Sequence, residues 1–214
     1  MNGVKLILAS GSPRRRELLA AAGIPHSVMK LDVDETPDVS RYKDRSLPYP
    51  EWYARECAGI KLRAASEAVF GGGVADALVV TADTVVSPDG TRIFGKPSDA
   101  EDAKAMLRAL SGTEHSVVGG ICVTDGKRTE TSSVSTLVRF KDLTEEEIDS
   151  YVASGEPFGK AGAYAIQEKG SLFVESVTGD YANIVGISVF ELRRMLMKFG
   201  YDPAVHSHRK VLSV

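Results

Sequence analysis

Residues 4–16 read VKLILASGSPRRR, and this stretch decides how the fold begins. The apolar run Val4–Ala9 predicts a buried strand, Ser10–Ser12 predicts a turn, and Ser12 followed by Pro13 predicts a helix N-terminus. Arg14–Arg16 then fall in the first turn of that helix, where each cation costs about 0.3–1 kcal/mol against the helix dipole. A bound anion reverses the sign, because the backbone amides and the guanidinium groups would both face it. We therefore predict a phosphate site here, with an exposed basic helix face as the alternative.

The composition is that of a globular protein with one sizeable core. The chain has 214 residues, of which 43% are hydrophobic and 26% charged, as is usual for soluble domains. The net charge of -3 argues against nucleic acid as a main partner, because domains that bind it are usually strongly basic. The arginine cluster is therefore a local feature.

Cysteine usage and hydropathy predict a cytoplasmic protein without a membrane partner. Cys57 and Cys122 lack partners at metal-ligand spacing, so we expect reduced core thiols. No apolar run approaches the length of a membrane span, and Val4–Ala9 is too short for a signal peptide. We expect a single domain over residues 1–214, with a loosely held tail from about Asp202.

Apolar periodicity, caps and turn residues predict an α/β fold: a mixed twisted sheet with flanking helices and a long antiparallel hairpin. The hairpin turns at Asp125-Gly126, and the pairs Ser98/Glu101 and Thr144/Glu147 are capping-box patterns. The predicted strands are Val4–Ala9, His26–Leu31, Ala77–Thr81, His115–Val123, Thr129–Phe140, Ala163–Ile166 and Ser171–Val177. The predicted helices are one starting at Pro13 and those at Glu51–Phe70, Ser98–Leu110, Thr144–Ala153 and Val189–Phe199. A long polar loop is predicted over Asp32–Pro50, and a polar turn over Gly179–Asn183.

Asp83 is the candidate for acid–base or metal chemistry. It follows the predicted strand Ala77–Thr81, and ligands of open α/β sheets bind beyond the carboxyl ends of strands. An aspartate in that place can hold a divalent ion or take a proton from water. An aspartate that merely caps a turn is the alternative.

Two glycine-flanked lysines are candidate phosphate ligands. Residues 90–97 read GTRIFGKP, which fails as a P-loop because Pro97 replaces the Ser/Thr and lacks an amide proton. Lys96 still has the setting of a phosphate-directed cation, with a solvated lysine as the alternative. Lys160 lies in the glycine-rich stretch 155–162, and Gln167 can donate and accept at a base edge. Three cationic turns with carboxylates imply a polyphosphate bound with a metal.

The histidines carry weaker signals. His206 and His208 could chelate a metal, but without further ligands we expect them to be exposed bystanders, and we expect His115 to be structural. No Ser-His-Asp or Cys-His arrangement is apparent from the sequence.

Ordered blocks along nearly the whole chain resemble the Maf (septum formation protein homologue) family of nucleoside triphosphate pyrophosphatases. The blocks are Leu8–Leu19, Ala82–Thr84, Gly95–Pro97, Leu110–Val117, Gly159–Gln167 and Gly179–Gly186. The resemblance implies hydrolysis of a nucleoside triphosphate to the monophosphate and pyrophosphate, with a divalent metal. It also implies a nucleotide cleft between two lobes and, as often in the family, a homodimer.

The resemblance also implies roles for single residues. Asp83 corresponds to the catalytic proton acceptor. Arg14, Thr84 and Gln167 occupy the positions that sort substrates, and this trio resembles the branch acting on dTTP, UTP and modified pyrimidine triphosphates. The branch acting on 7-methyl-GTP is the alternative. A rival from another class is a non-catalytic nucleotide-binding regulator of cell division.

The mechanism we expect places the triphosphate among Arg14, Arg15, Lys96 and Lys160, with hydroxyls and amides from Ser10 and Ser12. Mg²⁺, or alternatively Mn²⁺, bridges phosphate oxygens to Asp83 and Glu35, and Asp83 activates the water that attacks the α-phosphorus.

One departure from the family pattern concerns charge. Cys57 stands where the family commonly has a lysine, and Lys61 follows one helical turn later. Lys61 is expected either to reach the phosphates or to be solvated.

Overall fold

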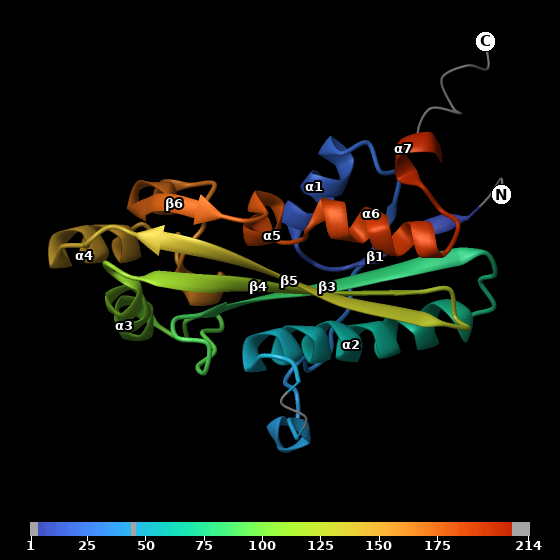
Figure 1. The fold of residues 1–214 in the computed structure, drawn as a ribbon, viewed down its shortest axis with the longest axis horizontal. Helices are drawn as coiled ribbons and strands as arrows, with labels where there is room; N and C mark the ends of the chain where they lie inside the picture. Colours follow the sequence, from blue (N-terminus) through green and yellow to red (C-terminus); the bar gives the residue numbers. More distant parts are fainter. Residues whose placement is uncertain (1–3, 44–45, 207–214) are drawn as a thin grey trace, which may run out of the picture.

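A six-stranded mixed sheet forms the centre of the protein (Figure 1). The computed structural model describes residues 4–43 and 46–206. The strand order is β2-β1-β3-β4-β5-β6; β1 pairs in parallel with β2 and β3, and the remaining pairs are antiparallel. The strands are β1 Lys5–Ala9, β2 Ser27–Met29, β3 Ala77–Ser87, β4 Glu114–Thr124, β5 Thr129–Phe140 and β6 Val174–Thr178. The predicted mixed sheet and its long hairpin, β4–β5, are confirmed.

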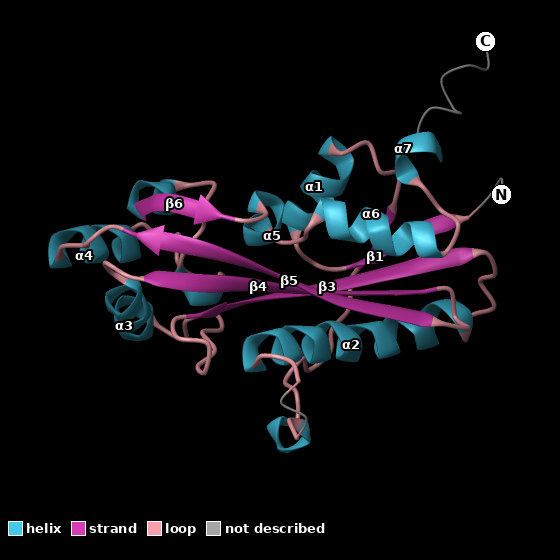
Figure 2. Cartoon of the chain, viewed as in Figure 1, coloured by secondary structure: helices cyan, strands magenta, loops and turns pink. Residues whose placement is uncertain are grey.

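Helices cover both faces of this sheet (Figure 2). The long helix α2 packs on one face, whereas α1, α5 and α6 lie on the other. The helices are α1 Pro13–Ala21, α2 Tyr49–Phe70, α3 Ala100–Leu110, α4 Glu145–Ala153, α5 Tyr181–Val185, α6 Val189–Lys198 and α7 Pro203–His206. Within the part of the chain that the structure describes, no helix combines the length and apolarity needed to cross a membrane.

One of the two predicted capping boxes is confirmed and the other is shifted. Thr144 and Glu147 exchange both bonds of a capping box at the start of α4. The Ser98 cap is wrong, because α3 begins at Ala100 and the Asp99 side chain accepts from the Asp102 amide. Ser98 instead donates its amide to the Asp102 carboxylate. Asp99 is an equally good cap, and it lies one residue closer to the helix.

Several predicted boundaries are corrected by tertiary pairing. The strand predicted at Ala77–Thr81 continues to Ser87, because β4 pairs along its whole length, from Val79↔Thr124 to Ser87↔Ser116. The strand expected at His26–Leu31 shortens to Ser27–Met29. The expected loop Asp32–Pro50 contains a 3₁₀ turn at Val39–Arg41, and α2 starts within its end, at Tyr49.

The segment after α4 is less extended than predicted. Ala163–Ile166 is not a strand; a 3₁₀ turn covers Ala161–Ala163, and both Gly162 and Ala163 have left-handed φ angles of 68° and 61°. A second 3₁₀ turn, Lys169–Phe173, takes up the first part of the strand predicted at Ser171–Val177. The predicted polar turn at Gly179–Asn183 is the start of α5, which Asp180 caps.

The C-terminal tail is described only in part. Tyr201 is buried and α7 follows from Pro203, so the beginning of the segment expected to be loosely held is helical. The rest of that expectation, residues 207–214 with His208, lies outside the described residues.

The larger clusters of buried apolar side chains lie towards the two ends of the long strands, in agreement with the two lobes expected. One cluster joins α3 and α4 to the strands, with Leu110, Phe140 and Ile148 at its centre. At the other end, Leu8, Leu19 and Leu196 pack on one face of the sheet, and α2 packs on the opposite face in a third cluster. The strands β3 to β5 run through both lobes.

A glycine pair in β4 lets helices approach both faces of the sheet. Successive strand residues point to opposite faces. A Cβ atom on Gly120 would overlap the Ala54 carbonyl of α2, and one on Gly119 would overlap the Asn183 side chain of α5. The sheet therefore carries close-packed helices on both sides of this point.

Gly120→Ala is expected to destabilise the protein by about 3 kcal/mol or more, because the new methyl group meets helix backbone, which cannot move without unpacking α2. Gly59→Ala is the matched control within α2, where the added Cβ meets only Arg63 Nη1 at 3.7 Å. This control should gain about 0.5–1 kcal/mol from helix propensity. Urea unfolding measures both, and equal stabilities of the two variants would contradict the close approach.

His115 is a structural histidine, as predicted. It is 2% exposed, its Nε2 lies 2.9 Å from the Tyr164 hydroxyl, and its ring packs edge-on against Phe140. Burial lowers the pKa of His115 from 6.5 to about 4. Between these two pH values His115 is protonated in the unfolded chain and neutral in the folded protein. The free energy of unfolding therefore falls as the pH drops from about 6.5 towards 4.

Replacing His115 should remove this part of the acid sensitivity. Between pH 7.5 and 4.5 the wild type is expected to lose about 2–3 kcal/mol more than His115→Phe, which cannot titrate. The double variant His115→Phe/Tyr164→Phe controls for the hydroxyl left without its partner. Denaturant unfolding across this pH range provides the measurement, and an equal pH dependence of wild type and both variants would contradict the assignment.

Candidate functional site

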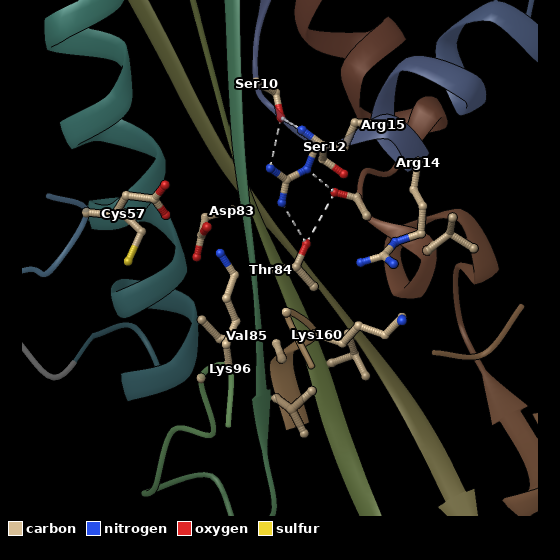
Figure 3. Close-up of a pocket in the computed structure, with 18 of the residues that line it drawn as sticks. Ser10, Ser12, Arg14, Arg15, Cys57, Asp83, Thr84, Val85, Lys96 and Lys160 are labelled. Carbon is tan, nitrogen blue, oxygen red and sulfur yellow. Dashed lines mark hydrogen bonds between the residues drawn. The ribbon is translucent and has the colours of Figure 1, made fainter. Parts of the chain in front are cut away.

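A cavity of about 720 Å³ opens where β1 ends beside β3. The last pair between the two strands is Leu8↔Val80, whereas β3 continues to Ser87, so the edge of β3 beyond that pair faces the turn that leads into α1. All ten predicted site residues line this cavity: Ser10, Ser12, Arg14, Arg15, Glu35, Asp83, Thr84, Lys96, Lys160 and Gln167. Figure 3 labels these residues except Glu35 and Gln167. The structure thus brings together side chains that are far apart in the sequence.

Asp83 reaches the cavity in a different way from the one predicted. It lies in the middle of β3 and not at its end, and the carboxyl end that opens the site belongs to β1. Strand alternation sends Asp83 and Thr84 to opposite faces of the sheet. Asp83 faces α2, whereas Thr84 faces the side of α1 and α5 (Figure 3).

Arg15 ties together the segments on the α1 side. It is only 8% exposed. Its Nε donates to the Gly186 carbonyl at 2.8 Å, its Nη2 to Thr84 Oγ1 at 3.2 Å and its Nη1 to Ser10 Oγ at 3.3 Å. Burial lowers the pKa of Arg15, and the charges of Asp83 and Glu35 oppose that shift. Three of the five guanidinium N–H groups are used in this way, so Arg15 forms part of the wall of the site.

The Gly186 carbonyl was not identified from the sequence. It accepts from Arg15 and also from the Thr84 hydroxyl, at 3.2 Å. A backbone acceptor has no side-chain signature, so the sequence signal was limited to the block Gly179–Gly186 that contains it.

The turn before α1 keeps its polar groups at the cavity. Ser10 Oγ accepts from the Ser12 amide at 3.2 Å. Ser12 occupies the N-cap position, yet its side chain makes no capping bond to the helix. The first amides of a helix have no carbonyl partner within it, so this end offers donors to an anion. Arg14 lines the cavity beside the turn, whereas Arg16 is exposed and is not among the lining residues.

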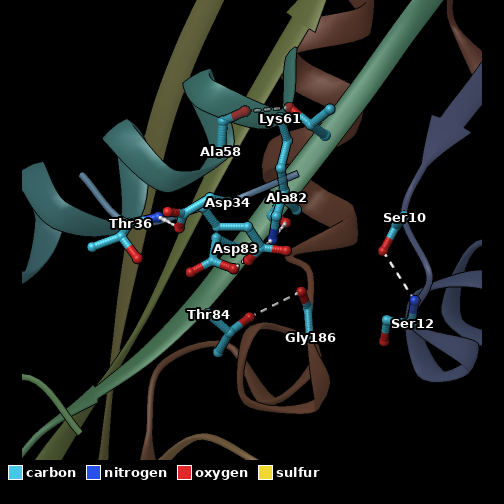
Figure 4. A network of polar contacts seen from close by, with 12 residues as sticks. Ser10, Ser12, Asp34, Thr36, Ala58, Lys61, Ala82, Asp83, Thr84 and Gly186 are labelled. Atoms are coloured by element: carbon cyan, nitrogen blue, oxygen red, sulfur yellow. Dashed lines mark hydrogen bonds and ion pairs between the residues drawn. The ribbon is translucent and has the colours of Figure 1, made fainter. Parts of the chain in front are cut away.

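Lys61 is the side chain whose role the sequence left open, and the structure places it inside the site (Figure 4). It is 7% exposed, so the solvated alternative is wrong. Its Nζ lies 2.7 Å from Asp83 Oδ1 and 2.7 Å from Glu35 Oε2, and it donates to the Ala82 carbonyl at 3.3 Å. Cys57, one turn earlier on α2, also lines the cavity, and burial raises its pKa, so the thiol is neutral.

Two loops supply the cations of the other lobe. Lys96 is exposed in the turn after β3, and Lys160 precedes the 3₁₀ turn Ala161–Ala163. The Gly162 amide donates to the Gly95 carbonyl at 3.0 Å and thereby joins the two loops. Lys160 is anchored by the Glu156 carbonyl and lies 3.7 Å from Glu168. Gln167 is exposed at the cavity.

The charge of the cavity is opposite to that of the whole protein. Among the residues that the structure describes, its lining contains five cationic side chains, Arg14, Arg15, Lys61, Lys96 and Lys160, against the two carboxylates of Glu35 and Asp83. The complete chain has a net charge of -3. Such a concentration of cations attracts a polyanion.

Glu35 and Asp83 are the two carboxylates of the cavity that could hold a divalent ion. Both lie within 2.7 Å of one ammonium nitrogen, so hard oxygen ligands converge on one point. No group of three or more His, Cys, Asp or Glu side chains suited to a metal occurs among residues 4–43 and 46–206. Mg²⁺ is often held by one or two carboxylates together with substrate phosphates, and Glu35 and Asp83 fit this arrangement.

Comparisons with known proteins show the family to which this chain belongs. The Maf-like protein family matches residues 5–199. The dTTP/UTP pyrophosphatase of Chromobacterium violaceum is 42% identical over 201 residues, 94% of this chain and 98% of that protein. The proteins of the same name from Pelotomaculum thermopropionicum and Bacillus cereus are 44% and 43% identical, each over 92% of this chain and over 98% and 97% of their own lengths. With the family match extending from β1 to the end of α6, and so across the whole cavity, this chain belongs to the Maf-like protein family.

Proposed function

We propose that this protein hydrolyses dTTP and UTP to the nucleoside monophosphate and pyrophosphate, and that it also accepts modified pyrimidine triphosphates. The observation that carries the proposal is the cationic cavity around Asp83, which joins all the predicted site residues in one place. The activity is the one named for relatives that are 42–44% identical over more than nine-tenths of the chain.

The triphosphate binds between the two lobes. Arg14 approaches it from the α1 side, and Lys96 and Lys160 approach it from the opposite loops. The Ser10–Ser12 turn adds hydroxyl and amide donors at the helix N-terminus. Cations on both sides of the polyanion hold it in place and stabilise charge that develops on the leaving pyrophosphate.

Asp83 accepts the proton of the attacking water. In the free protein Lys61 Nζ lies 2.7 Å from Asp83 Oδ1, so the carboxylate is already oriented on β3 before the substrate binds. The water oxygen forms a bond to the α-phosphorus as the bond to the bridging oxygen of pyrophosphate breaks, and the proton passes to Asp83. Because Asp83 lies in β3 and the triphosphate is held by fixed side chains, the water and the α-phosphorus are oriented for the attack.

Glu35 and Asp83 are the residues that would hold Mg²⁺, or Mn²⁺ in its place. When bound, a divalent ion neutralises charge on the phosphate oxygens and polarises the reacting phosphoryl group. Glu35 reaches the site from the segment between β2 and the 3₁₀ turn Val39–Arg41, opposite α2.

Gln167 reads the pyrimidine edge, because its amide donates and accepts together as the imide of uracil or thymine requires. Thr84 supports this selection indirectly by linking Arg15 to the Gly186 carbonyl. We expect the enzyme to act in the cytoplasm as a homodimer, with no nucleic acid partner.

The first test of the proposal is product analysis with the Asp83→Asn variant. Purified protein with Mg²⁺ is given dTTP, UTP, CTP, ITP and 7-methyl-GTP in ¹⁸O-labelled water. We expect monophosphate and pyrophosphate from dTTP and UTP, with the label in the monophosphate. Asp83→Asn should lower kcat by roughly 10²–10⁴-fold, the usual contribution of a general base. Glu146→Gln, the same change at an exposed position of α4, is the control and should leave kcat unchanged.

Each other outcome of this panel has a definite meaning. Preference for 7-methyl-GTP would overturn the assignment of Arg14, Thr84 and Gln167 to pyrimidine recognition. Label in pyrophosphate would move the attack to the β-phosphorus. Absence of turnover in the wild type would favour a nucleotide-binding regulator.

Gln167→Glu should change the base preference. Two acceptor oxygens can no longer donate to a uracil carbonyl, so kcat/KM for UTP is expected to fall about tenfold, by roughly 1–2 kcal/mol in transition-state binding. The value for CTP, whose exocyclic amine is a donor, should fall less. Steady-state kinetics with both nucleotides provide the measurement, and an equal loss for the two would assign Gln167 to a role other than base reading.

A further inference from the structure

We propose that Lys61 is an internal counter-ion, which occupies the point between Glu35 and Asp83 and withholds both carboxylates from a divalent ion until a nucleoside triphosphate binds. This inference rests on the proposed function of the site, and it concerns when the metal binds. It follows from the contacts of a single buried ammonium group.

The donor capacity of Lys61 is fully used inside the protein. An ammonium group has three protons and no acceptor. Lys61 Nζ contacts Glu35 Oε2 and Asp83 Oδ1 at 2.7 Å each and the Ala82 carbonyl at 3.3 Å. No donor is left for a phosphate, so the alternative in which Lys61 binds the triphosphate directly does not fit this arrangement.

Lys61 holds together residues that arrive from three separate segments. It extends from α2, Asp83 belongs to β3, and Glu35 lies in the chain between β2 and α2. Its side chain is 9% exposed, and that of Asp83 is 15% exposed. A charge so removed from water needs a partner, and removing the ammonium would leave two carboxylates repelling each other at short range.

Two carboxylates without an ammonium between them would form an acidic pair for a divalent ion. Mg²⁺ and Mn²⁺ seek hard oxygen ligands, which here are the oxygens that the ammonium contacts. Lys61 and the metal therefore compete for the same atoms.

The charges around Lys61 also disfavour a divalent ion in the free protein. Arg15 interacts electrostatically with both Asp83 and Glu35, so two cations balance two carboxylates in the free protein. Tyr53 and Cys57, the other α2 residues that line the cavity, carry no carboxylate. The free site therefore has no excess negative charge to attract a divalent ion. A bound triphosphate supplies that charge and further oxygen ligands.

The consequence is a coupling between nucleotide and metal. Metal affinity of the free enzyme is low, and it rises when the triphosphate is present. By thermodynamic linkage the metal raises the nucleotide affinity by the same factor.

Mn²⁺ binding without turnover tests the proposal. Free Mn²⁺ is followed by electron paramagnetic resonance while it is added to the full-length protein, with and without a dTTP analogue whose α,β-bridging oxygen is replaced by NH. Without nucleotide we expect a Kd for Mn²⁺ on the order of 1 mM or higher. With the analogue we expect this Kd to fall by about tenfold or more.

Lys61→Met removes the ammonium and keeps the side-chain length, so it should tighten nucleotide-free Mn²⁺ binding by roughly tenfold or more. Lys61→Arg keeps the charge and should bind weakly, like the wild type. Lys104→Met is the matched control. Lys104 also contacts two carboxylates, Asp149 at 2.7 Å and Glu101 at 3.5 Å, but on the surface, and its loss should leave Mn²⁺ binding unchanged.

A folded Lys61→Met protein that binds Mn²⁺ no more tightly than the wild type would overturn the proposal. So would wild-type protein that binds Mn²⁺ at micromolar concentration without nucleotide, a result that needs no variant and stands even where Lys61→Met fails to fold. Turnover of the wild type is measured separately. If the wild type is active but binds the metal tightly without nucleotide, the counter-ion role of Lys61 is contradicted, whereas the proposed function stands.

Discussion

The site depends on a difference in length between two parallel strands. β1 leaves the sheet after Ala9, whereas β3 continues to Ser87 because β4 pairs along it. The open edge of β3 then faces the turn that starts α1, and one residue step along the strand separates Asp83 on one face from Thr84 on the other. A ligand in this opening can be reached from both faces of the sheet at once, which a fully paired sheet would not allow.

The glycine pair in β4 makes this opening compatible with close packing. Gly120 pairs with Asp83 and Gly119 pairs with Thr84. Since neither has a side chain, α2 approaches beside Asp83 and α5 approaches beside Thr84. These helices bring Lys61 and the Gly186 carbonyl to the strand, so the packing of the sheet and the polar contacts of the site have the same origin.

The cations of the cavity divide into two kinds. Arg15 and Lys61 are buried and have their protons directed to groups of the protein, so they set the shape of the walls and balance Glu35 and Asp83. Arg14, Lys96 and Lys160 come from separate segments at the cavity and provide the positive excess. We infer that the first kind is required for order and the second for attraction of the polyphosphate.

The sequence by itself determined the elements with strong local signals and several of the charged residues that line the cavity. Strand alternation on either side of Asp125-Gly126 predicted the hairpin, and the Thr144/Glu147 pair predicted the start of α4. The turn before α1 and the glycine-flanked turns predicted cations that line the cavity, among them Arg14, Lys96 and Lys160. Tertiary structure alone decided how far β3 extends, because strand length depends on a partner distant in the chain. It also decided the cap of α3, where two adjacent residues were equally suited, and the non-extended course of Ala163–Ile166. The partners of Lys61 could not be predicted either. Helical spacing places Lys61 on one face of α2, but its partners Glu35 and Asp83 belong to other segments, and only the tertiary structure shows that these segments meet.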